Sequence, residues 1–449
     1  MKIIIIGAGV VGTTLAKKLS EDGHSVVVIT NEAALAKQVQ ESMDVQVMLG
    51  DSADGTLLQE AGLAEADLVL AVTDSDESNI ISTLMAQAYN PSAKIIARVR
   101  KQQFLNNPIL SKGMTLGGAM VFSPEYAAVE MVLDLLQVDQ AFEVVPFKHG
   151  LVRIAGFQMG SDSVLLGRSL QESGLAKTGA LVVAVDKGGE VVIPTGKTVL
   201  QATDRVLIST EAKAGFEKIL PVLGRTPVRH RKIVIAGGGW KGEQVAREVE
   251  RRGIPVVILE KSLSRCQELA EQLDNTDVIH CDATDPETIR NMACRASTLI
   301  GMTGQQEVNL VLCLLARQSG AKRTIALMDN QAYLSLAPKL GIDAVVSPKL
   351  AAVGKIMRFL STGKVIDAAT ALNGQLDAVF VEVQANSRIA GMAIQALGLP
   401  KPLIVAAVVR EGKMVVPTGG FVLGAGDHIL IITTAGHFHK IDAVLSAAA

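Results

Sequence analysis

Aromatic residues are scarce in this chain, and neither sign of charge dominates it. Phenylalanine, tryptophan and tyrosine make up 3% of the 449 residues, and the formal net charge is −2. Proteins that bind single-stranded nucleic acids stack bases on aromatic rings, and proteins that bind duplexes carry an excess of Lys and Arg. The composition therefore argues against nucleic acid as a partner.

Long hydrophobic runs are also missing. The apolar start, MKIIIIGAG, is interrupted by glycine too early to be a signal peptide. No stretch reaches the roughly 18 uninterrupted apolar residues that a membrane-spanning helix needs. We therefore expect a cytoplasmic chain whose hydrophobic residues, 49% of the total, fill the cores of buried sheets.

Metal-binding patterns are absent as well. The cysteines are too widely spaced for a zinc motif or a C-x-x-C pair, so we expect reduced, buried thiols at Cys266, Cys281, Cys294 and Cys313. His437 and His439 form an H-x-H pair without an acidic or thiol partner at ligand spacing. We expect that pair to lie on the surface and to hold no metal.

The sequence does contain an internal repeat, in which one unit occurs twice. The segment KIIIIGAGVVG from residue 2 returns as KIVIAGGGWKG from residue 232, and VTDSDESNI returns as MTGQQEVNL. Later, SPEYAAVEMVLDLL returns as SPKLAAVGKIMRFL, and VVIPTG returns as MVVPTG. Because the order of these segments is kept over nearly the whole chain, we infer a duplication.

Each copy begins with strand and helix patterns in alternation. In the first copy, apolar runs predict strands at 2–6, 25–29, 45–49, 68–73 and 95–99. Strands that alternate with helices predict an α/β fold with a Rossmann-like, doubly wound parallel sheet. A short β-rich α+β lobe follows in each copy, with hairpin turns expected at Lys187-Gly188-Gly189 and Glu411-Gly412-Lys413.

Four lobes are therefore predicted. They are N-lobe 1 (1–124), C-lobe 1 (142–224), N-lobe 2 (231–349) and C-lobe 2 (366–449). A helix that starts at Pro124 connects the first two, with apolar positions at Ala128, Val132 and Leu135. Its apolar face packs either on the lobe's own sheet or on a partner subunit, and the sequence favours neither.

A glycine-rich loop follows the first strand of each copy. In the G-x-G-x-x-G pattern the first glycine permits a tight turn, the second admits a pyrophosphate, and the third lets the helix pack on the sheet. The helix N-terminus then attracts phosphate. We expect nucleotide binding at Gly7, Ala8, Gly9, Val10, Val11 and Gly12, and at Gly237, Gly238, Gly239, Trp240, Lys241 and Gly242.

The two loops differ in the contacts expected around them. An acidic residue that grips the ribose should end the second strand, and Glu260 does so where the first copy has Thr30. Conversely, Arg98 and Arg100 end the fifth strand of the first copy, where alternation places both on one face to meet phosphate.

The second copy lacks those arginines. There Lys241 could supply positive charge, and Trp240 either shields the helix end or stacks on a base.

Polar residues also follow the third and fourth strands. Asp51 and Asp282 either accept from an adenine amino group or cap the next helix. Thr73 and Thr303 end the fourth strand at the ligand-binding edge of the sheet, and Asp74, which follows Thr73, has Gly304 as its counterpart.

Catalytic patterns are missing. None of the tyrosines starts a Y-x-x-x-K pair, and no cluster of His, Cys or paired carboxylates appears. We therefore favour a protein that senses a nucleotide without transforming it. The alternatives are an NAD-dependent oxidoreductase with an unrecognised catalytic residue, and a nucleotide-binding regulator of another partner.

The order of the glycine loop, GDSADG, VTDSDESNI, IARVR, SPEYA and a β-rich lobe ending in VVIPTG and DRVLI resembles the RCK (KTN) domain. Two such units in one chain are similar to regulatory subunits of Trk-type potassium uptake systems. The resemblance implies NAD(H), ATP and ADP as regulatory ligands. It also implies a homo-oligomeric ring, a dimer or tetramer, on the inner face of the membrane below a TrkH- or TrkG-like potassium transporter subunit.

Overall fold

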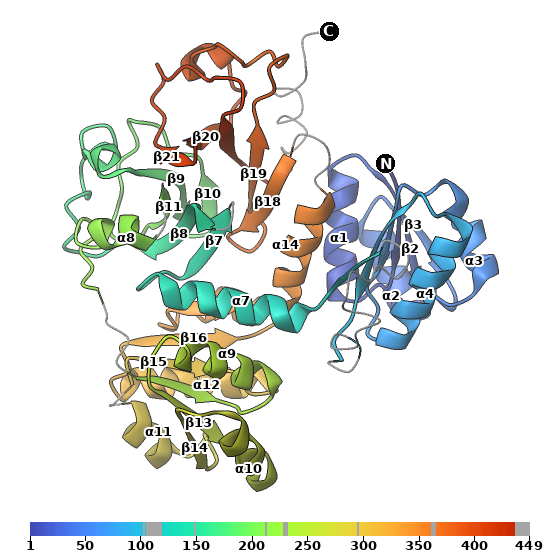
Figure 1. The fold of residues 1–449 in the computed structure, drawn as a ribbon, viewed down its shortest axis with the longest axis horizontal. Coiled ribbons are helices and arrows are strands. Elements are labelled where there is room, and N and C mark those ends of the chain that lie inside the picture. The colour runs from blue at the N-terminus through green and yellow to red at the C-terminus, as the bar shows by residue number, and fades with distance from the viewer. Residues whose placement is uncertain are drawn as a thin grey trace. The chain divides into compact units, whose positions relative to one another are not determined.

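The computed structural model describes residues 1–101, 104, 119–147, 150–211, 213–227, 232–293, 296–360 and 365–435. They form two compact units, shown as ribbons in Figure 1. Unit 1 holds residues 1–127 with 349–356, and unit 2 holds residues 128–348 with 357–449. The expected surface pair His437 and His439 lies outside the described residues, as does Cys294. No helix of the described part is both long and apolar enough to cross a bilayer.

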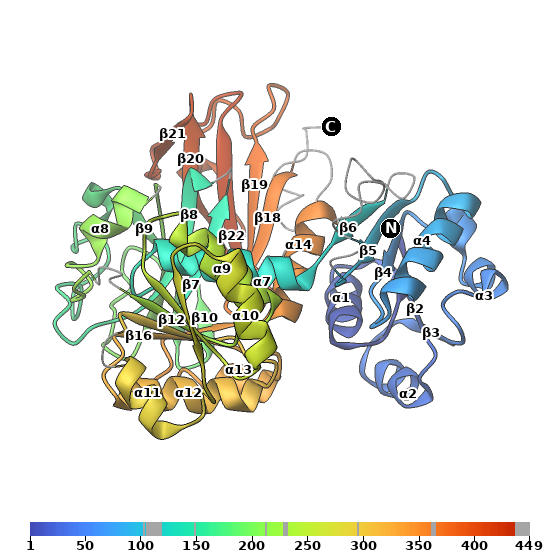
Figure 2. The same ribbon diagram turned by 60° about the horizontal axis from the view of Figure 1, so that its bottom comes forward.

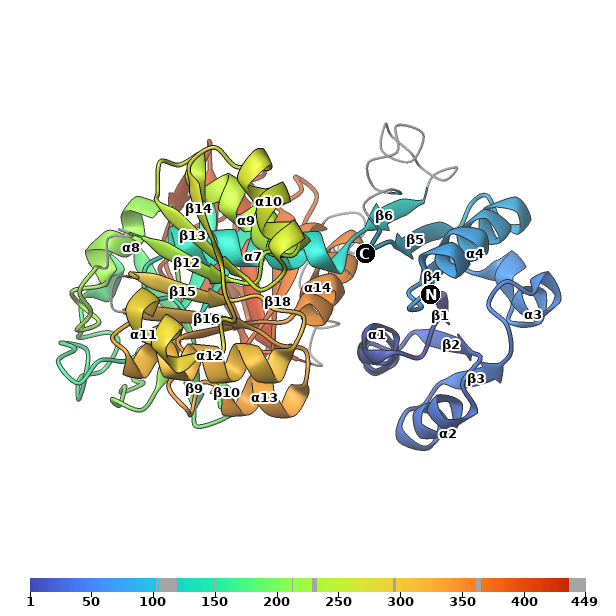
Figure 3. The same cartoon turned by 90° about the horizontal axis from the view of Figure 1, so that it is seen from below.

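Unit 1 is built on a six-stranded parallel sheet in the order β3-β2-β1-β4-β5-β6. Its helices α1 and α2 lie on one face and α3 and α4 on the other (Figure 3). The elements are β1 (Lys2–Ile6), α1 (Val10–Glu21), β2 (Ser25–Thr30), α2 (Ala33–Ser42), β3 (Gln46–Leu49), α3 (Gly55–Glu60), β4 (Leu68–Ala71), α4 (Asp76–Tyr89), β5 (Lys94–Arg98) and β6 (Met120–Phe122).

The predicted doubly wound fold is confirmed, because this strand order is that of dinucleotide-binding domains. Three details of the prediction are wrong. Strand β4 ends at Ala71, so Thr73 lies two residues beyond the strand and does not end it. The sheet has a sixth strand, β6, that the five apolar runs did not include. Strand β5 ends at Arg98, so Arg100 lies beyond it and strand alternation does not relate the two arginines.

Unit 2 contains the second sheet of this type, in the equivalent order β14-β13-β12-β15-β16-β17. In Figure 3, α9 and α10 cover one face and α11, α12 and α13 cover the other. The elements are β12 (Ile233–Ala236), α9 (Trp240–Glu250), β13 (Val256–Glu260), α10 (Leu263–Gln272), β14 (Thr276–His280), α11 (Pro286–Ala293), β15 (Thr298–Gly301), α12 (Gln306–Gln318), β16 (Arg323–Leu327), α13 (Gln331–Leu336) and β17 (Ala344–Val346).

Each C-lobe is a five-stranded antiparallel sheet, and both sheets belong to unit 2. The first, in the order β10-β9-β11-β8-β7, comprises β7 (Glu143–Phe147), β8 (Val152–Gln158), β9 (Ala180–Lys187), β10 (Glu190–Val192) and β11 (Arg205–Glu211), and α8 (Lys213–Ile219) follows it. The second, in the order β18-β19-β22-β20-β21, comprises β18 (Val365–Ala371), β19 (Leu376–Glu382), β20 (Leu403–Arg410), β21 (Lys413–Val415) and β22 (His428–Thr434). Both predicted hairpin turns are present, between β9 and β10 and between β20 and β21.

The two C-lobe sheets pack against each other (Figure 2). One buried apolar cluster joins them, with Phe147 and Phe380 at a ring-centroid separation of 6.4 Å. Within the cluster, the buried Ser209 hydroxyl donates to the Ala406 carbonyl at 2.7 Å. The duplication therefore lets one chain supply both halves of a sheet-on-sheet core.

The connecting helix α7 (Pro124–Gln137) packs against two lobes of its own chain. Ala128, Val132 and Leu135 are buried in an apolar cluster that also holds residues of C-lobe 1 and N-lobe 2. The helix thus packs on the C-lobe of its own copy and on the N-lobe sheet of the other copy, and a contact with a partner subunit stays a prediction. A second connecting helix, α14 (Pro348–Leu360), contributes its residues 349–356 to unit 1.

The C-terminal end of α7 is fixed by one buried arginine of N-lobe 2. Arg323 in β16 donates to the carbonyls of Leu135 at 2.8 Å, Val138 at 3.2 Å and Ala141. Orphan carbonyls at a helix C-terminus attract cations, and here burial lowers the pKa of Arg323 to about 10. Because this pKa is still well above neutral pH, the arginine stays charged and ties α7 to the sheet.

Candidate nucleotide-binding sites

The first glycine loop connects β1 to α1, with the backbone geometry that the pattern requires. Gly7 has a φ of 112° and donates to the Ile29 carbonyl at 2.8 Å. A Cβ on Gly7 would lie 2.8 Å from the Thr73 nitrogen, and a Cβ on Gly12 would lie 1.8 Å from the Gly7 carbonyl oxygen. Both positions therefore exclude any side chain, and they hold the loop against the end of β4.

The second loop repeats this geometry between β12 and α9. Gly237 also has a φ of 112°, and a Cβ on Gly242 would lie 2.0 Å from the Gly237 carbonyl oxygen. Gly9 and Gly239 differ from these glycines. No atom lies closer than 3.9 Å to a Cβ on Gly9, and none lies within 4 Å of one on Gly239. Since the protein itself leaves this space open, the middle glycine of each loop provides room for a ligand.

The remaining residues of the two loops face different surroundings. Val10 starts α1 and is 48% exposed, whereas Ala8 and Val11 are buried. Trp240 starts α9 and packs, partly buried, against the core cluster that includes α7. Both roles named for Trp240, cover of the helix end and stacking on a base, stay predictions. Lys241 beside it is half-buried.

The ribose end is charged only in the second copy. Glu260 ends β13, where one carboxylate oxygen accepts from the Gly238 nitrogen at 2.8 Å and the other from the Ser262 nitrogen at 2.8 Å. Thr30 ends β2 at the equivalent place and is 5% exposed. A carboxylate that is fixed beside the loop is suited to accept from ribose hydroxyls, and a buried threonine is a weaker acceptor.

Arginine braces the second loop as well. Arg265, in the first turn of α10, donates to the Gly238 carbonyl at 2.9 Å and pairs with Glu243 of α9 at 2.6 Å. Glu243 is nearly buried and also pairs with Arg247 at 3.0 Å. No sequence motif marks this brace. It leaves the second loop fixed on both sides, by Glu260 and by Arg265.

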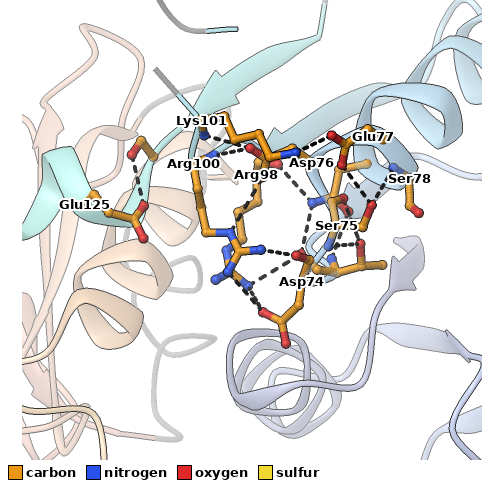
Figure 4. A network of polar contacts seen from close by, with 12 residues as sticks. Asp74, Ser75, Asp76, Glu77, Ser78, Arg98, Arg100, Lys101 and Glu125 are labelled. Carbon is orange, nitrogen blue, oxygen red and sulfur yellow. Dashed lines mark hydrogen bonds and ion pairs between the residues drawn. The ribbon is translucent and has the colours of Figure 1, made fainter. Parts of the chain in front are cut away.

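The phosphate end is charged in the first copy. Figure 4 shows Arg98 and Arg100 converging on Asp74, at 3.0 Å for Arg98 and 3.9 Å for Arg100. Only 7% of the Arg98 side chain is exposed, whereas 79% of the Asp74 side chain is. Although Arg100 lies beyond β5, its guanidinium reaches the same point, where it also donates to the Asp74 carbonyl.

The same edge of N-lobe 2 has no such cations. The strand pairings align Leu327 with Arg98, Asp329 with Arg100 and Gly304 with Asp74. An apolar and an acidic side chain thus replace two arginines. The first edge therefore presents two guanidinium groups, which are suited to phosphate, and the second edge has none at the equivalent positions.

One asparagine in each copy organises this edge and was not singled out from the sequence. The Asn79 amide oxygen accepts from the Thr73 nitrogen and hydroxyl at 2.8 and 2.7 Å, while its nitrogen donates to the Arg98 carbonyl at 2.9 Å. Asn309 makes the same contacts with Thr303 and Leu327. A repeat-by-repeat comparison could have found it, because VTDSDESNI and MTGQQEVNL share this asparagine.

A second organising position also recurs. The buried Asp76 accepts from the Arg100 and Lys101 nitrogens at 2.9 and 2.7 Å, and so fixes the backbone that carries Arg100. Its counterpart Gln306 accepts from Asp329 and Asn330 at 3.1 and 2.9 Å. A side chain at this position thus binds the backbone after the fifth strand in both copies. The side chain is a carboxylate in the first copy and a neutral amide in the second.

Neither Asp51 nor Asp282 is the N-cap of the following helix. Asp51 accepts from the Ala53 nitrogen at 2.9 Å in the turn before α3, which is capped by Asp54. Asp282 accepts from the Thr284 nitrogen and hydroxyl, which lower its pKa and keep it ionised. The helix-cap alternative is thus wrong for both residues, and the role of adenine acceptor stays a prediction.

The expectation of reduced thiols agrees with the described cysteines, which form no disulfide. Cys266 and Cys313 are buried, and Cys281 is half-buried. Burial raises the pKa of Cys313 to about 12, so its thiol is inert at neutral pH. Among the described residues no group of His, Cys, Asp and Glu is arranged to hold a metal ion.

Comparison with known proteins matches two family models to the chain, each of them twice. The TrkA-N domain model matches residues 3–124 and 233–348, and the TrkA-C domain model matches residues 154–220 and 378–446. A curated relative from Methanosarcina mazei, "Trk system potassium uptake protein TrkA homolog 1", is 32% identical, with 98% of this chain and 99% of the relative covered.

Solved structures with the same fold include the GsuK RCK domain, with a TM-score of 0.59 and 22% identity over 99% of this chain and 94% of that one. The GsuK channel bound to NAD has a TM-score of 0.58 and 21% identity, with 99% of this chain and 78% of that chain covered. The curated relatives are named as Trk system potassium uptake proteins.

Proposed function

The chain belongs to the TrkA family of tandem TrkA-N and TrkA-C proteins, and from this premise we propose that it is a nucleotide-sensing gating subunit of a Trk-type potassium uptake system. Nucleotide binding at the two glycine loops changes how far a TrkH- or TrkG-like membrane subunit opens. The observation that carries the proposal is the pair of preformed cradles, each with open space at its middle glycine.

The ligands follow from the charges around each cradle. Site 1 comprises Gly7, Ala8, Gly9, Val10, Val11, Gly12, Thr30, Asp51, Thr73, Asp74, Arg98 and Arg100. Its arginines favour ligands with several phosphate charges, such as ATP and ADP.

Site 2 comprises Gly237, Gly238, Gly239, Trp240, Lys241, Gly242, Glu260, Asp282 and Thr303. Its fixed carboxylate favours ligands held through ribose, such as NAD(H). The GsuK channel, which has been solved bound to NAD, supports NAD(H) as a ligand by analogy.

The assembly follows from the free energy that gating needs. A ligand shifts a two-state equilibrium only by its differential affinity, and a nearly complete shift takes about 5.5 kcal/mol. Several sites acting together supply this more easily than one, so the proposal includes a homo-oligomeric ring, a dimer or tetramer, on the inner membrane face. Its building blocks are the lobes 1–124, 142–224, 231–349 and 366–449.

The test is potassium flux into vesicles that hold the membrane subunit and this protein. We expect NADH, ATP or ADP to change the flux, and the nucleotide to be recovered chemically unchanged. Gly9→Asp and Gly239→Asp should each remove the response that belongs to one site, because the new carboxylate fills the phosphate position. A flux that ignores all three nucleotides, or turnover of NADH, would contradict the proposal.

A further inference from the structure

The carboxylate of Asp74 lies beside the first glycine loop. Its Oδ2 is 3.9 Å from the point that a Cβ on Gly9 would take, and Gly9 is the N-cap of α1. Its Oδ1 pairs with Arg98 at 3.0 Å. Figure 4 shows that the same carboxylate faces the guanidinium groups of both Arg98 and Arg100.

An exposed anion in this place is held by attraction that a ligand can replace. Ion pairs with one largely exposed partner contribute little to stability, and 79% of the Asp74 side chain is exposed. The helix N-terminus and the two arginines attract any anion, and a phosphate carries more charge than one carboxylate. Asp74 and a phosphate therefore compete for the same positive groups.

We infer that Asp74 is a built-in competitor of the nucleotide, an internal anion that a phosphate must displace from Arg98, Arg100 and the Gly9 loop. This inference rests on the proposed binding of a nucleotide at site 1 and concerns how that site selects its ligand. A ligand with several phosphate charges displaces the carboxylate, whereas a nucleoside without phosphate does not. Site 1 then responds to phosphate charge.

Displacement involves the side chain of Asp74 and not the turn that carries it. Thr73 stays bound to Asn79, and the Ser75 hydroxyl still caps α4 by accepting from the Ser78 nitrogen at 3.1 Å. Site 2 has no such device, because Gly304 stands at this position and carries no side chain.

Calorimetry on the full-length chain tests the inference, with Gly239→Asp present throughout so that only site 1 binds. Adenosine, AMP, ADP and ATP are titrated without divalent cations into Asp74→Asn and into Asp74→Gly, which restores the residue of the second copy. Loss of one like charge at about 4 Å in water should tighten ATP binding about fivefold in each variant. Adenosine binding should not change.

Glu77→Gln is the matched control. Glu77 is an exposed carboxylate of the same network that pairs with Lys101, so its loss removes the same charge from the surface. We expect its ATP affinity to stay within about twofold of the parent chain. Weaker or unchanged ATP binding in both Asp74 variants, or an equal gain for adenosine, would overturn the inference and leave site 1 intact. Absence of nucleotide binding in the parent chain would overturn the proposed function and the inference with it.

Discussion

The two N-lobes share a backbone and differ in where they place charge. Both loops have the same turn at the first glycine and the same close approach of the third glycine to the carbonyl oxygen of the first. In both lobes an asparagine, Asn79 or Asn309, binds the threonine that follows the fourth strand. N-lobe 1 then puts its charges at the phosphate end, with Arg98 and Arg100, whereas N-lobe 2 puts them at the ribose end, with Glu260. The comparison teaches that the duplication kept the backbone of the loop and changed where the charges around it lie.

The largest effect should come from the glycines that both copies need. Gly12→Ala and Gly242→Ala force a Cβ to within 1.8 and 2.0 Å of a carbonyl oxygen, so the helix must shift from the sheet. We expect each to lower the free energy of unfolding by about 1–3 kcal/mol, measured by denaturant titration. Gly9→Ala and Gly239→Ala are the controls, since their sites have room. They should fold normally and lose nucleotide affinity, and equal destabilisation by all four would refute this account of the loops.

Exchanging the residues at the phosphate end should have the next largest effect. Arg98→Leu gives N-lobe 1 the residue of N-lobe 2 and removes a charge-assisted contact. We expect ATP binding at site 1 to weaken by about 10- to 100-fold, as for loss of a hydrogen bond to a charged group. Isothermal calorimetry in the Gly239→Asp background measures it. Leu327→Arg in the Gly9→Asp background is the reciprocal control and should strengthen ATP binding at site 2. No change in Arg98→Leu would show that this arginine does not contact phosphate.

Exchanging the ribose end should have a smaller effect. Glu260→Thr removes the carboxylate that accepts from the Gly238 nitrogen and faces the ribose position. We expect NADH affinity at site 2 to fall about tenfold, which fluorescence titration in the Gly9→Asp background measures. Glu260→Gln keeps the size of the side chain and the acceptor and should lose less. Were Glu260→Gln to lose as much affinity as Glu260→Thr, charge rather than hydrogen bonding would govern the contact.

The smallest effect concerns the reactivity of the cysteine thiols, all of which belong to N-lobe 2. A thiolate forms only as the pH rises toward the thiol pKa, and for Cys313 that pKa is raised to about 12 by burial. Iodoacetamide at pH 8 should therefore leave Cys313 unmodified in the folded protein. The half-buried Cys281 should react faster, as peptide mass spectrometry can follow. Rapid labelling of Cys313 would mean that N-lobe 2 opens far more than its packed core allows.

The fold could be predicted from the sequence because its signals are local and occur twice. Apolar strands, glycine spacing and their order over both copies predict two doubly wound sheets and two antiparallel ones, and the structure confirms them. The sixth strand was missed because Met120–Phe122 is too short to show a pattern of its own.

The charged contacts around the cradles depend on long-range packing and could not be predicted in full. The brace by Arg265 and the tie from Arg323 to α7 join residues far apart in sequence, and nothing local marks either arginine. Arg100 reaches Asp74 from beyond the strand because Asp76 holds its backbone, which strand alternation does not describe. The sequence shows an asparagine at position 79 and at its counterpart in the second copy. Its role, to link the residue Thr73 after β4 to the end of β5, follows only from the folded structure.

The division of labour between the two cradles is tested most directly by the salt dependence of ATP binding at each site. In the Gly9→Asp variant ATP binds only at site 2, and in the Gly239→Asp variant it binds only at site 1, so each variant gives the salt dependence of one site. Salt screens the attraction between ATP and a partly exposed cation, and 37% of the Arg100 side chain is exposed. ATP affinity at site 1 should therefore fall more steeply with salt concentration than at site 2. Equal slopes at the two sites would contradict the account.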